Sequence, residues 1–108
     1  MARALIHMPA TARQGETIEI RALIGHAMET GHRPGADGKV VARDIIRTFA
    51  CSYNGATVFD AALHPAISAN PYIAFFTVAT ESGTLEFTWR GDNGFAQTER
   101  MPITVSAA

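Results

Sequence analysis

The sequence is short of cysteine and of charged residues. Its 108 residues include one cysteine, Cys51, which excludes an intrachain disulfide and a zinc site built from several cysteines of this chain. Charged residues make up 18% of the chain and the formal net charge is −1. A balance so close to zero provides no electrostatic footprint for nucleic acid or for an anionic membrane surface, so neither is expected as a partner.

Long hydrophobic runs are also lacking. No stretch approaches the roughly 18 apolar residues of a membrane span, and the first residues lack the apolar segment of a signal peptide. Taken alone, this pattern predicts a cytoplasmic protein. Hydrophobic residues nevertheless make up 47% of the chain, which is enough for one folded domain over residues 1–108 with a core of its own.

Alternation of apolar and polar residues dominates what is present. The clearest segment, 16–24, places Ile18, Ile20, Ala22 and Ile24 on one face. Six further segments are predicted to be strands, and they are 3–8, 43–53, 56–61, 72–80, 84–90 and 95–105. About seven short strands separated by turn residues predict an all-β fold, an immunoglobulin-like antiparallel β-sandwich.

Three local features refine this prediction. Asn54-Gly55 is the dipeptide most typical of a two-residue hairpin, because both central residues of such a turn take positive φ. Pro102 cannot donate a ladder hydrogen bond, so the last strand should lie at an edge or carry a bulge there. The segment 64–71 has two prolines and no period, which indicates a crossing loop.

The segment 24–43, called the excursion below, separates two strongly alternating strands and is too long for a hairpin turn. A loop of this length in a compact domain is either functional or disordered. Its mixture of histidine, methionine, glutamate and threonine favours an ordered loop. The turn residues 34–38 are predicted to form its far end, so that two extended arms meet at a tip.

Cys51 is the first candidate for chemistry. It lies in mid-strand on the same face as Phe49, with no adjacent base to lower its pKa, so core packing is expected. The alternative is a nucleophilic or sulfur-carrying thiol. A carrier thiol needs reach, however, and the sequence ends without a cysteine on a flexible tail. We therefore predict that the chain is not an enzyme and is not itself the covalent carrier.

Two other clusters have a functional and an ordinary interpretation. His26, Met28 and His32 offer imidazole and thioether ligands that suit copper, and a stand-alone periplasmic copper-binding sandwich is the alternative function. Such loop residues serve more often as contacts, so no metal or other cofactor is predicted. A basic rim for small anions or an acidic partner, whose alternative is a solvated face, would consist of Arg33, Lys39, Arg43 and Arg47.

Four segments carry a resemblance to a known family. They are His26–Arg33, Tyr53–Gly55, Pro65–Tyr72 and Trp89–Gly94. Together they resemble the successive signatures of SoxZ, the small subunit of the SoxYZ thiosulfate-oxidation carrier. The first and third segments are specific in combination, whereas Asn-Gly and Asp-Asn-Gly alone are generic turns. The resemblance extends from about residue 16 to about residue 105, nearly the whole chain.

The resemblance implies a β-sandwich that pairs with a SoxY-like chain in a heterodimer. The C-terminal arm of SoxY bears a cysteine on which sulfur intermediates are carried and passed among the other Sox enzymes. A periplasmic location is therefore expected, with export alongside the partner in place of a signal peptide of its own. Homodimerisation or aggregation is expected where the partner is absent, and no catalytic residue is assigned to this chain.

The candidate contact residues for the partner or its arm lie in the excursion. They are His26, Met28, Glu29, Thr30 and Arg33. An ordered loop rich in such side chains needs a surface to order against, which favours contact. In the alternative, Met28 packs on the sandwich and Glu29 or Thr30 caps loop amides. A partner also implies an apolar surface, which is expected along 72–78.

Overall fold

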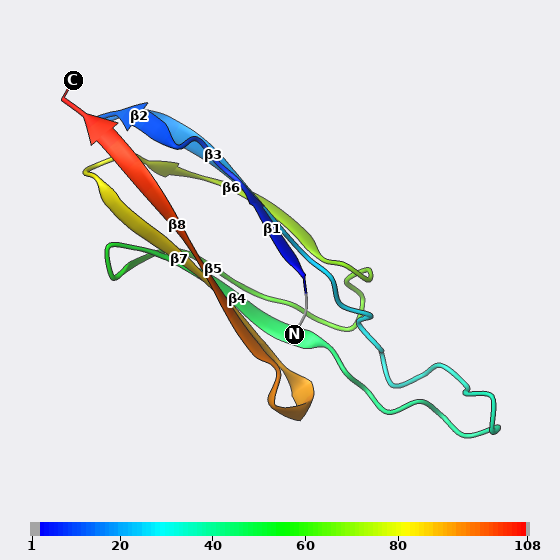
Figure 1. Ribbon diagram of the computed structural model, residues 1–108. Helices are drawn as coiled ribbons and strands as arrows, with labels where there is room; N and C mark the ends of the chain where they lie inside the picture. Colours follow the sequence, from blue (N-terminus) through cyan, green and yellow to red (C-terminus); the bar gives the residue numbers. More distant parts are fainter. Residues whose placement is uncertain (1–2, 108) are drawn as a thin grey trace.

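The protein, seen in a computed structural model that describes residues 3–107, is a sandwich of two β-sheets (Figure 1). Its eight strands are β1 (Ala4–His7), β2 (Thr11–Arg13), β3 (Thr17–Ile24), β4 (Ile46–Tyr53), β5 (Ala56–Ala62), β6 (Tyr72–Val78), β7 (Gly83–Gly91) and β8 (Ala96–Ser106), and the 3-10 turn η1 (Asp92–Gly94) follows β7. One sheet has the order β1-β3-β6 and the other the order β2-β8-β7-β4-β5. The described residues include no helix long and apolar enough to cross a membrane.

The predicted all-β sandwich is confirmed, with eight strands in place of about seven. The additional strand is β2, whose three residues are too few to show an alternation in the sequence. It pairs in parallel with the end of β8, from Thr11 opposite Thr104 to Arg13 opposite Ser106. The other strand pairs of the described sheets are antiparallel.

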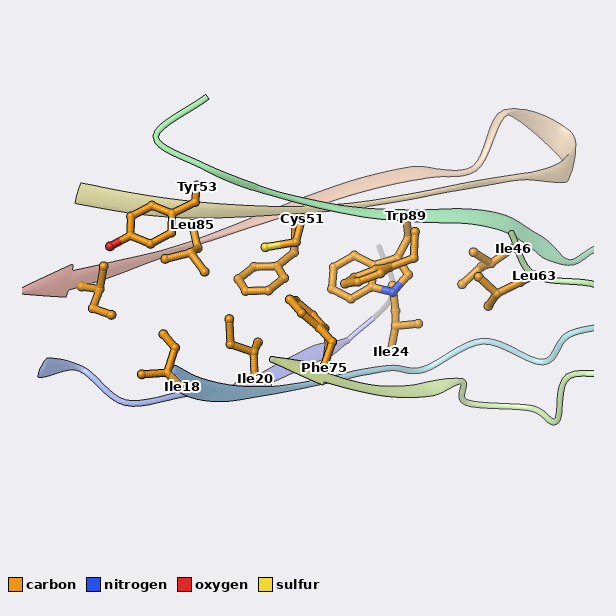
Figure 2. Close-up of a cluster of buried hydrophobic side chains, with 14 of the residues drawn as sticks. Ile18, Ile20, Ile24, Ile46, Cys51, Tyr53, Leu63, Phe75, Leu85 and Trp89 are labelled. Atoms are coloured by element: carbon orange, nitrogen blue, oxygen red, sulfur yellow. The ribbon is translucent and has the colours of Figure 1, made fainter. Parts of the chain in front are cut away.

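The core lies between the two sheets, as the alternation predicts. Figure 2 shows Ile18, Ile20 and Ile24 of β3 pointing toward Leu85 and Trp89 of β7. All five side chains are at most 2% exposed. Burial of large aliphatic and aromatic side chains of this kind contributes roughly 1.5–3 kcal/mol each to folding, which is why the register of the alternating strands is well determined.

Arg47, which broke the apolar side of the predicted strand, marks a β-bulge. Ile46 pairs with Gly91 and Thr48 pairs with Arg90, so two residues of β4 span a single step of β7. The extra residue, Arg47, shifts the alternation by one position and turns its own side chain to solvent. The exception in the sequence pattern therefore has a geometric cause.

Gly91 is required where β7 faces this bulge. Its backbone is extended, with φ −155° and ψ −165°, so the requirement is steric and has no connection with a left-handed conformation. A Cβ atom at this position would lie 2.9 Å from the Cα atom of Ile46 and closer still to the carbonyl oxygen of Ile45. Gly91, within the Trp89–Gly94 segment, thus lets β4 and β7 approach each other closely at the bulge.

The turn and proline predictions are confirmed locally. Asn54 and Gly55 have φ values of 49° and 88°, as the hairpin between β4 and β5 requires. Pro102 lies opposite Thr84 of β7, while β2 on the other side of β8 pairs only from Thr104 onward. Pro102 therefore lies in a part of β8 that has no paired strand on the β2 side and behaves there as an edge.

In the structure the excursion is the chain between β3 and β4, which covers residues 25–45 in place of the predicted 24–43. It projects beyond one end of the sandwich (Figure 1). It contributes to an elongated molecule measuring 61 × 20 × 19 Å. Two isolated bridges, Glu29 with Asp44 and Pro34 with Val40, hold its arms side by side. The predicted arrangement of two extended arms and a turn at the tip is confirmed.

Candidate interaction site

The base of the excursion brings together three of the four sequence segments described above. The backbone N–H of His26 donates to Asn70 Oδ1 at 3.0 Å, and the backbone N–H of Asn70 donates to the carbonyl oxygen of His26 at 2.7 Å. From η1, Asp92 Oδ2 accepts the backbone N–H of Ile45 at 3.2 Å. Residues far apart in the sequence therefore converge at one end of the sandwich.

The side chain of His26 is directed into this junction. Its ring packs edge-on against Phe95, with 5.1 Å between ring centroids, and only 8% of the side chain is exposed. Nδ1 accepts the backbone N–H of Met28 at 2.9 Å, which places the proton of the neutral imidazole on Nε2. Nε2 lies 3.8 Å from Asp44 Oδ1 on the returning arm.

Met28 is part of the core. Its side chain is 4% exposed, and its Sδ accepts the backbone N–H of Ile46 at 3.3 Å. Its φ of 53° lies in the left-handed region, which a non-glycine residue adopts only where surrounding contacts hold it. The internal alternative for Met28 is therefore the one that the structure displays.

The accessible part of the predicted contact set consists of Glu29, Thr30 and Arg33. Arg33 Nη2 lies 2.7 Å from Glu29 Oε1, and this hydrogen bond lowers the pKa of Glu29 below its ordinary value. Thr30 Oγ1 accepts the backbone N–H of His32 at 3.2 Å and so caps a loop amide, as the internal alternative predicted. Contact of these three side chains with a partner stays a prediction, as it does for His26 and Met28.

The predicted basic rim is largely neutralised by carboxylates. Arg43 makes two hydrogen bonds to Asp92, at 2.8 and 2.9 Å, and Arg47 Nε lies 3.4 Å from the same carboxylate. The hydrogen bond from Arg43, with the backbone N–H of Ile45 and the charge of Arg47, lowers the pKa of Asp92 below its ordinary value. Sequence reasoning assigned no role to Asp92, whose one local signal was its position in an Asp-Asn-Gly turn.

The proposed copper ligands are not assembled. His26 Nδ1 and Met28 Sδ each accept a backbone N–H, whereas His32 is exposed. Among residues 3–107, no group of three or more His, Cys, Asp or Glu side chains is placed to hold a metal ion. This geometry gives no support to the copper-binding alternative.

Cys51 is sealed inside the sandwich. Its side chain is 0% exposed, and burial raises the pKa of the thiol to about 12. A thiol with that pKa remains protonated near neutral pH and is a poor nucleophile. The predicted packing role is confirmed.

The outer surface of the three-stranded sheet carries large apolar side chains that are open to solvent, beside polar residues of β1 and β3. The name apolar face is used below for five side chains on it, which are Leu5, Leu23, Tyr72, Phe76 and Val78. Four of them are between 46% and 63% exposed. The expected apolar surface along 72–78 is therefore confirmed. Leu5 and Leu23 were not predicted as part of it, because they lie on the outward sides of β1 and β3, where polar residues are expected.

A model of a protein family, described as sulphur oxidation protein SoxZ, matches residues 6–102. The chain belongs to the SoxZ family. The matched range includes all four segments on which the resemblance in the sequence depended, so that prediction is confirmed. No individually curated protein matches the sequence of this SoxZ-family chain.

Solved structures with the same fold share little sequence with this SoxZ-family chain. A superoxide reductase (neelaredoxin) from Ignicoccus hospitalis matches with a TM-score of 0.70 and 18% identity, over 95% of this chain and 80% of that one. The sulfur carrier protein SoxY from Chlorobium limicola f thiosulfatophilum matches with a TM-score of 0.65 and 11% identity, over 95% and 78%. At such identities the likeness establishes the fold and leaves function to other observations.

Proposed function

We propose that this chain is the non-catalytic subunit of a periplasmic sulfur-carrier heterodimer. Its partner is a SoxY-like chain that carries sulfur intermediates on a C-terminal cysteine during thiosulfate oxidation and presents them to other Sox enzymes. The observation that carries the proposal is the SoxZ family match over residues 6–102. The periplasmic location is part of the same proposal, since the sulfur carrier and the enzymes that act on it have to share a compartment.

The burial of Cys51, the one cysteine of the sequence, supports the assignment of the sulfur-carrying cysteine to the partner. Covalent carriage of sulfur requires a thiolate that reaches the active sites of several enzymes, and Cys51 is buried and protonated. The carrying cysteine must therefore belong to another chain. This chain contributes a folded surface, and the excursion is the part of it that projects farthest from the sandwich.

The test is co-purification of the chain with the SoxY-like protein of the same organism, followed by intact-mass spectrometry before and after incubation with thiosulfate and the Sox cytochrome. We expect a stable heterodimer in which the added sulfur mass appears on the partner alone. The Cys51→Ala variant is the matched control and should leave that mass pattern unchanged. Failure to form a complex, or sulfur mass on Cys51 in the unmodified chain, would refute the proposal.

A further inference from the structure

We propose that the apolar face is the surface on which the SoxY-like partner packs, sheet against sheet. This inference rests on the proposed function, and it adds the location and the chemistry of the contact. The partner surface it requires is a sheet face that is largely apolar and that offers polar side chains opposite Glu19 and Arg21 of β3.

The two outer faces of the sandwich differ in the large apolar side chains that they expose. On the five-stranded sheet, β7 and β8 direct threonines and charged residues outward, and Glu86 and Arg100 form an ion pair at 2.9 Å across the two strands. On the three-stranded sheet, Tyr72 is 58% exposed and Phe76 is 63% exposed. Large exposed side chains of this kind on one face only are typical of an interaction surface.

The apolar side chains form a contiguous group across the sheet. Leu5 lies opposite Leu23, and Leu23 lies opposite Tyr72, so one row crosses all three strands. Along β6 the row continues through Ala74 to Phe76 and Val78, whose neighbours on β3 are Glu19 and Thr17. β6 is an edge strand that contains neither a charged residue nor a proline, the features with which exposed edges are usually protected.

Three adjoining hollows run along β1 and β3 on this side of the molecule. The first, of about 360 Å³, and the second, of about 270 Å³, share Leu5 and Leu23 in their walls. The second and the third, of about 340 Å³, share His7 and Arg21. Hollows of this size are suited to receive anchoring side chains of a partner.

The charged residues within the face are compatible with being covered. Arg21 lies opposite Ala74 and Glu19 lies opposite Phe76, so both are beside the apolar side chains of β6. Arg21 Nη2 lies 2.8 Å from Glu19 Oε1 on the same strand, so the pair neutralises itself before any partner arrives. Covering a paired charge costs less than covering a lone one. The pair also offers hydrogen-bonding groups to polar side chains of the partner.

The shape of the partner argues for a sandwich as the occupant. The SoxY structure from Chlorobium limicola superposes on 95% of this chain with a TM-score of 0.65, so a chain of that fold has sheets of similar twist. Sheets of similar twist pack face to face at a separation of about 10 Å. The pairing of β3 with β1 and with β6 runs without a register shift, which leaves this face regular enough for such packing.

The area of the face sets a further condition. From ordinary strand spacing and rise, three strands of this length present a footprint on the order of 300 Å². A stable interface buries roughly 800 Å² on each partner. The apolar face is therefore the centre of the interface, and the partner extends past it over the open edge of β6 and the hollows beside β1.

The test compares Phe76→Glu with Thr98→Glu, which places the same charge at an exposed strand position on the opposite face. Each variant is mixed with the SoxY-like partner and the Kd is measured by titration calorimetry, with circular dichroism to establish folding. We expect the Kd to rise about 30-fold or more for Phe76→Glu and to stay within about threefold for Thr98→Glu. Equal Kd values for the two variants and the unmodified chain would overturn the inference.

A second measurement needs no substitution in the face. Hydroxyl-radical footprinting of the unmodified chain, alone and in the heterodimer, reports the solvent exposure of Tyr72 and Phe76 directly. We expect both side chains to be oxidised several-fold more slowly in the heterodimer. Unchanged oxidation rates would exclude the face from the interface even if Phe76→Glu failed to fold.

The outcomes separate this inference from the proposed function. If the unmodified chain forms no heterodimer, the proposed function fails and the inference fails with it. If the heterodimer forms but tolerates Phe76→Glu and leaves Tyr72 exposed, only the inference is wrong. Sedimentation of the isolated chain tests whether a second copy of it covers the apolar face instead. The inference would also be overturned if Phe76→Glu abolished a homodimer but left the heterodimer unaffected.

Discussion

Asn70 and His26 lie 44 positions apart and are joined by two hydrogen bonds, one through the Asn70 side chain and one through its backbone N–H. The contact fastens the start of the excursion to the proline-rich crossing loop. Because the His26 ring also packs on Phe95, the same junction includes the chain just after η1. The orientation of the projecting arm is therefore decided at its base.

Replacement of Asn70 should loosen this junction. Asn70 has a φ of 54°, so Asn70→Ala loses the side-chain acceptor and also places alanine in a left-handed conformation. We expect a loss of about 2 kcal/mol in the free energy of unfolding, and about 1 kcal/mol for Asn70→Gly, which tolerates that φ. Urea denaturation of both variants measures this difference. Identical stabilities for Ala and Gly would contradict the assigned backbone strain.

Met28 should behave as a core residue. Met28→Ala removes most of a buried side chain and is expected to lower the free energy of unfolding by about 2–4 kcal/mol. Met28→Leu keeps the volume but removes the sulfur acceptor of the Ile46 amide, with an expected loss of about 1 kcal/mol. Thermal unfolding followed by circular dichroism provides the comparison. A Met28→Ala variant as stable as the unmodified chain would mean that the side chain serves only an external contact.

Asp92 should make the attachment of the returning arm sensitive to acid. Arg43 holds the pKa of Asp92 below its ordinary value of 3.8, so the carboxylate stabilises the folded state fully above that pH. The contribution is lost as the pH falls through the lowered pKa of the folded state. We therefore expect the stability difference between the unmodified chain and Asp92→Asn to be largest near neutral pH and to shrink below about pH 4.

Urea denaturation of the two proteins across this range measures the effect. The other carboxylates titrate in both proteins, so their contributions cancel when the two free energies of unfolding are subtracted. The difference therefore reports the titration of Asp92 alone. A difference that stayed constant down to strongly acidic pH would show that the ion pairs of Asp92 with Arg43 and Arg47 do not stabilise the fold.

Cys51 should resist modification in the folded chain and destabilise it at high pH. Burial raises the pKa of the thiol from 9.0 to about 12, so the neutral thiol favours the folded state. That contribution is complete below pH 9.0, the ordinary pKa, and is lost as the pH rises toward about 12. Iodoacetamide should label Cys51 only after denaturation, and the stability of Cys51→Ala should fall less steeply above pH 9.0. Rapid labelling of the native chain would contradict the burial.

Local pattern was sufficient for much of the fold. The period of two places Ile18, Ile20 and Ile24 inside because each strand has one face toward the core and one toward solvent. The Asn54-Gly55 turn follows from positive φ at both positions, a requirement of the chain itself. The extent of the excursion and the turn at its tip were likewise readable from the residues, as was membership of the SoxZ family.

The junction and the apolar face depend on which distant segments become neighbours. Nothing near His26 indicates that Asn70 will accept its amide proton, or that the Met28 sulfur will accept that of Ile46, because these contacts arise only once both sheets have closed on each other. Leu5 and Leu23 look unremarkable in their own strands and become part of a surface only when Tyr72 is paired beside them. The residues alone specify strands, turns and core faces, whose physics is local, whereas the register between distant strands decides the junction and the surface left for a partner.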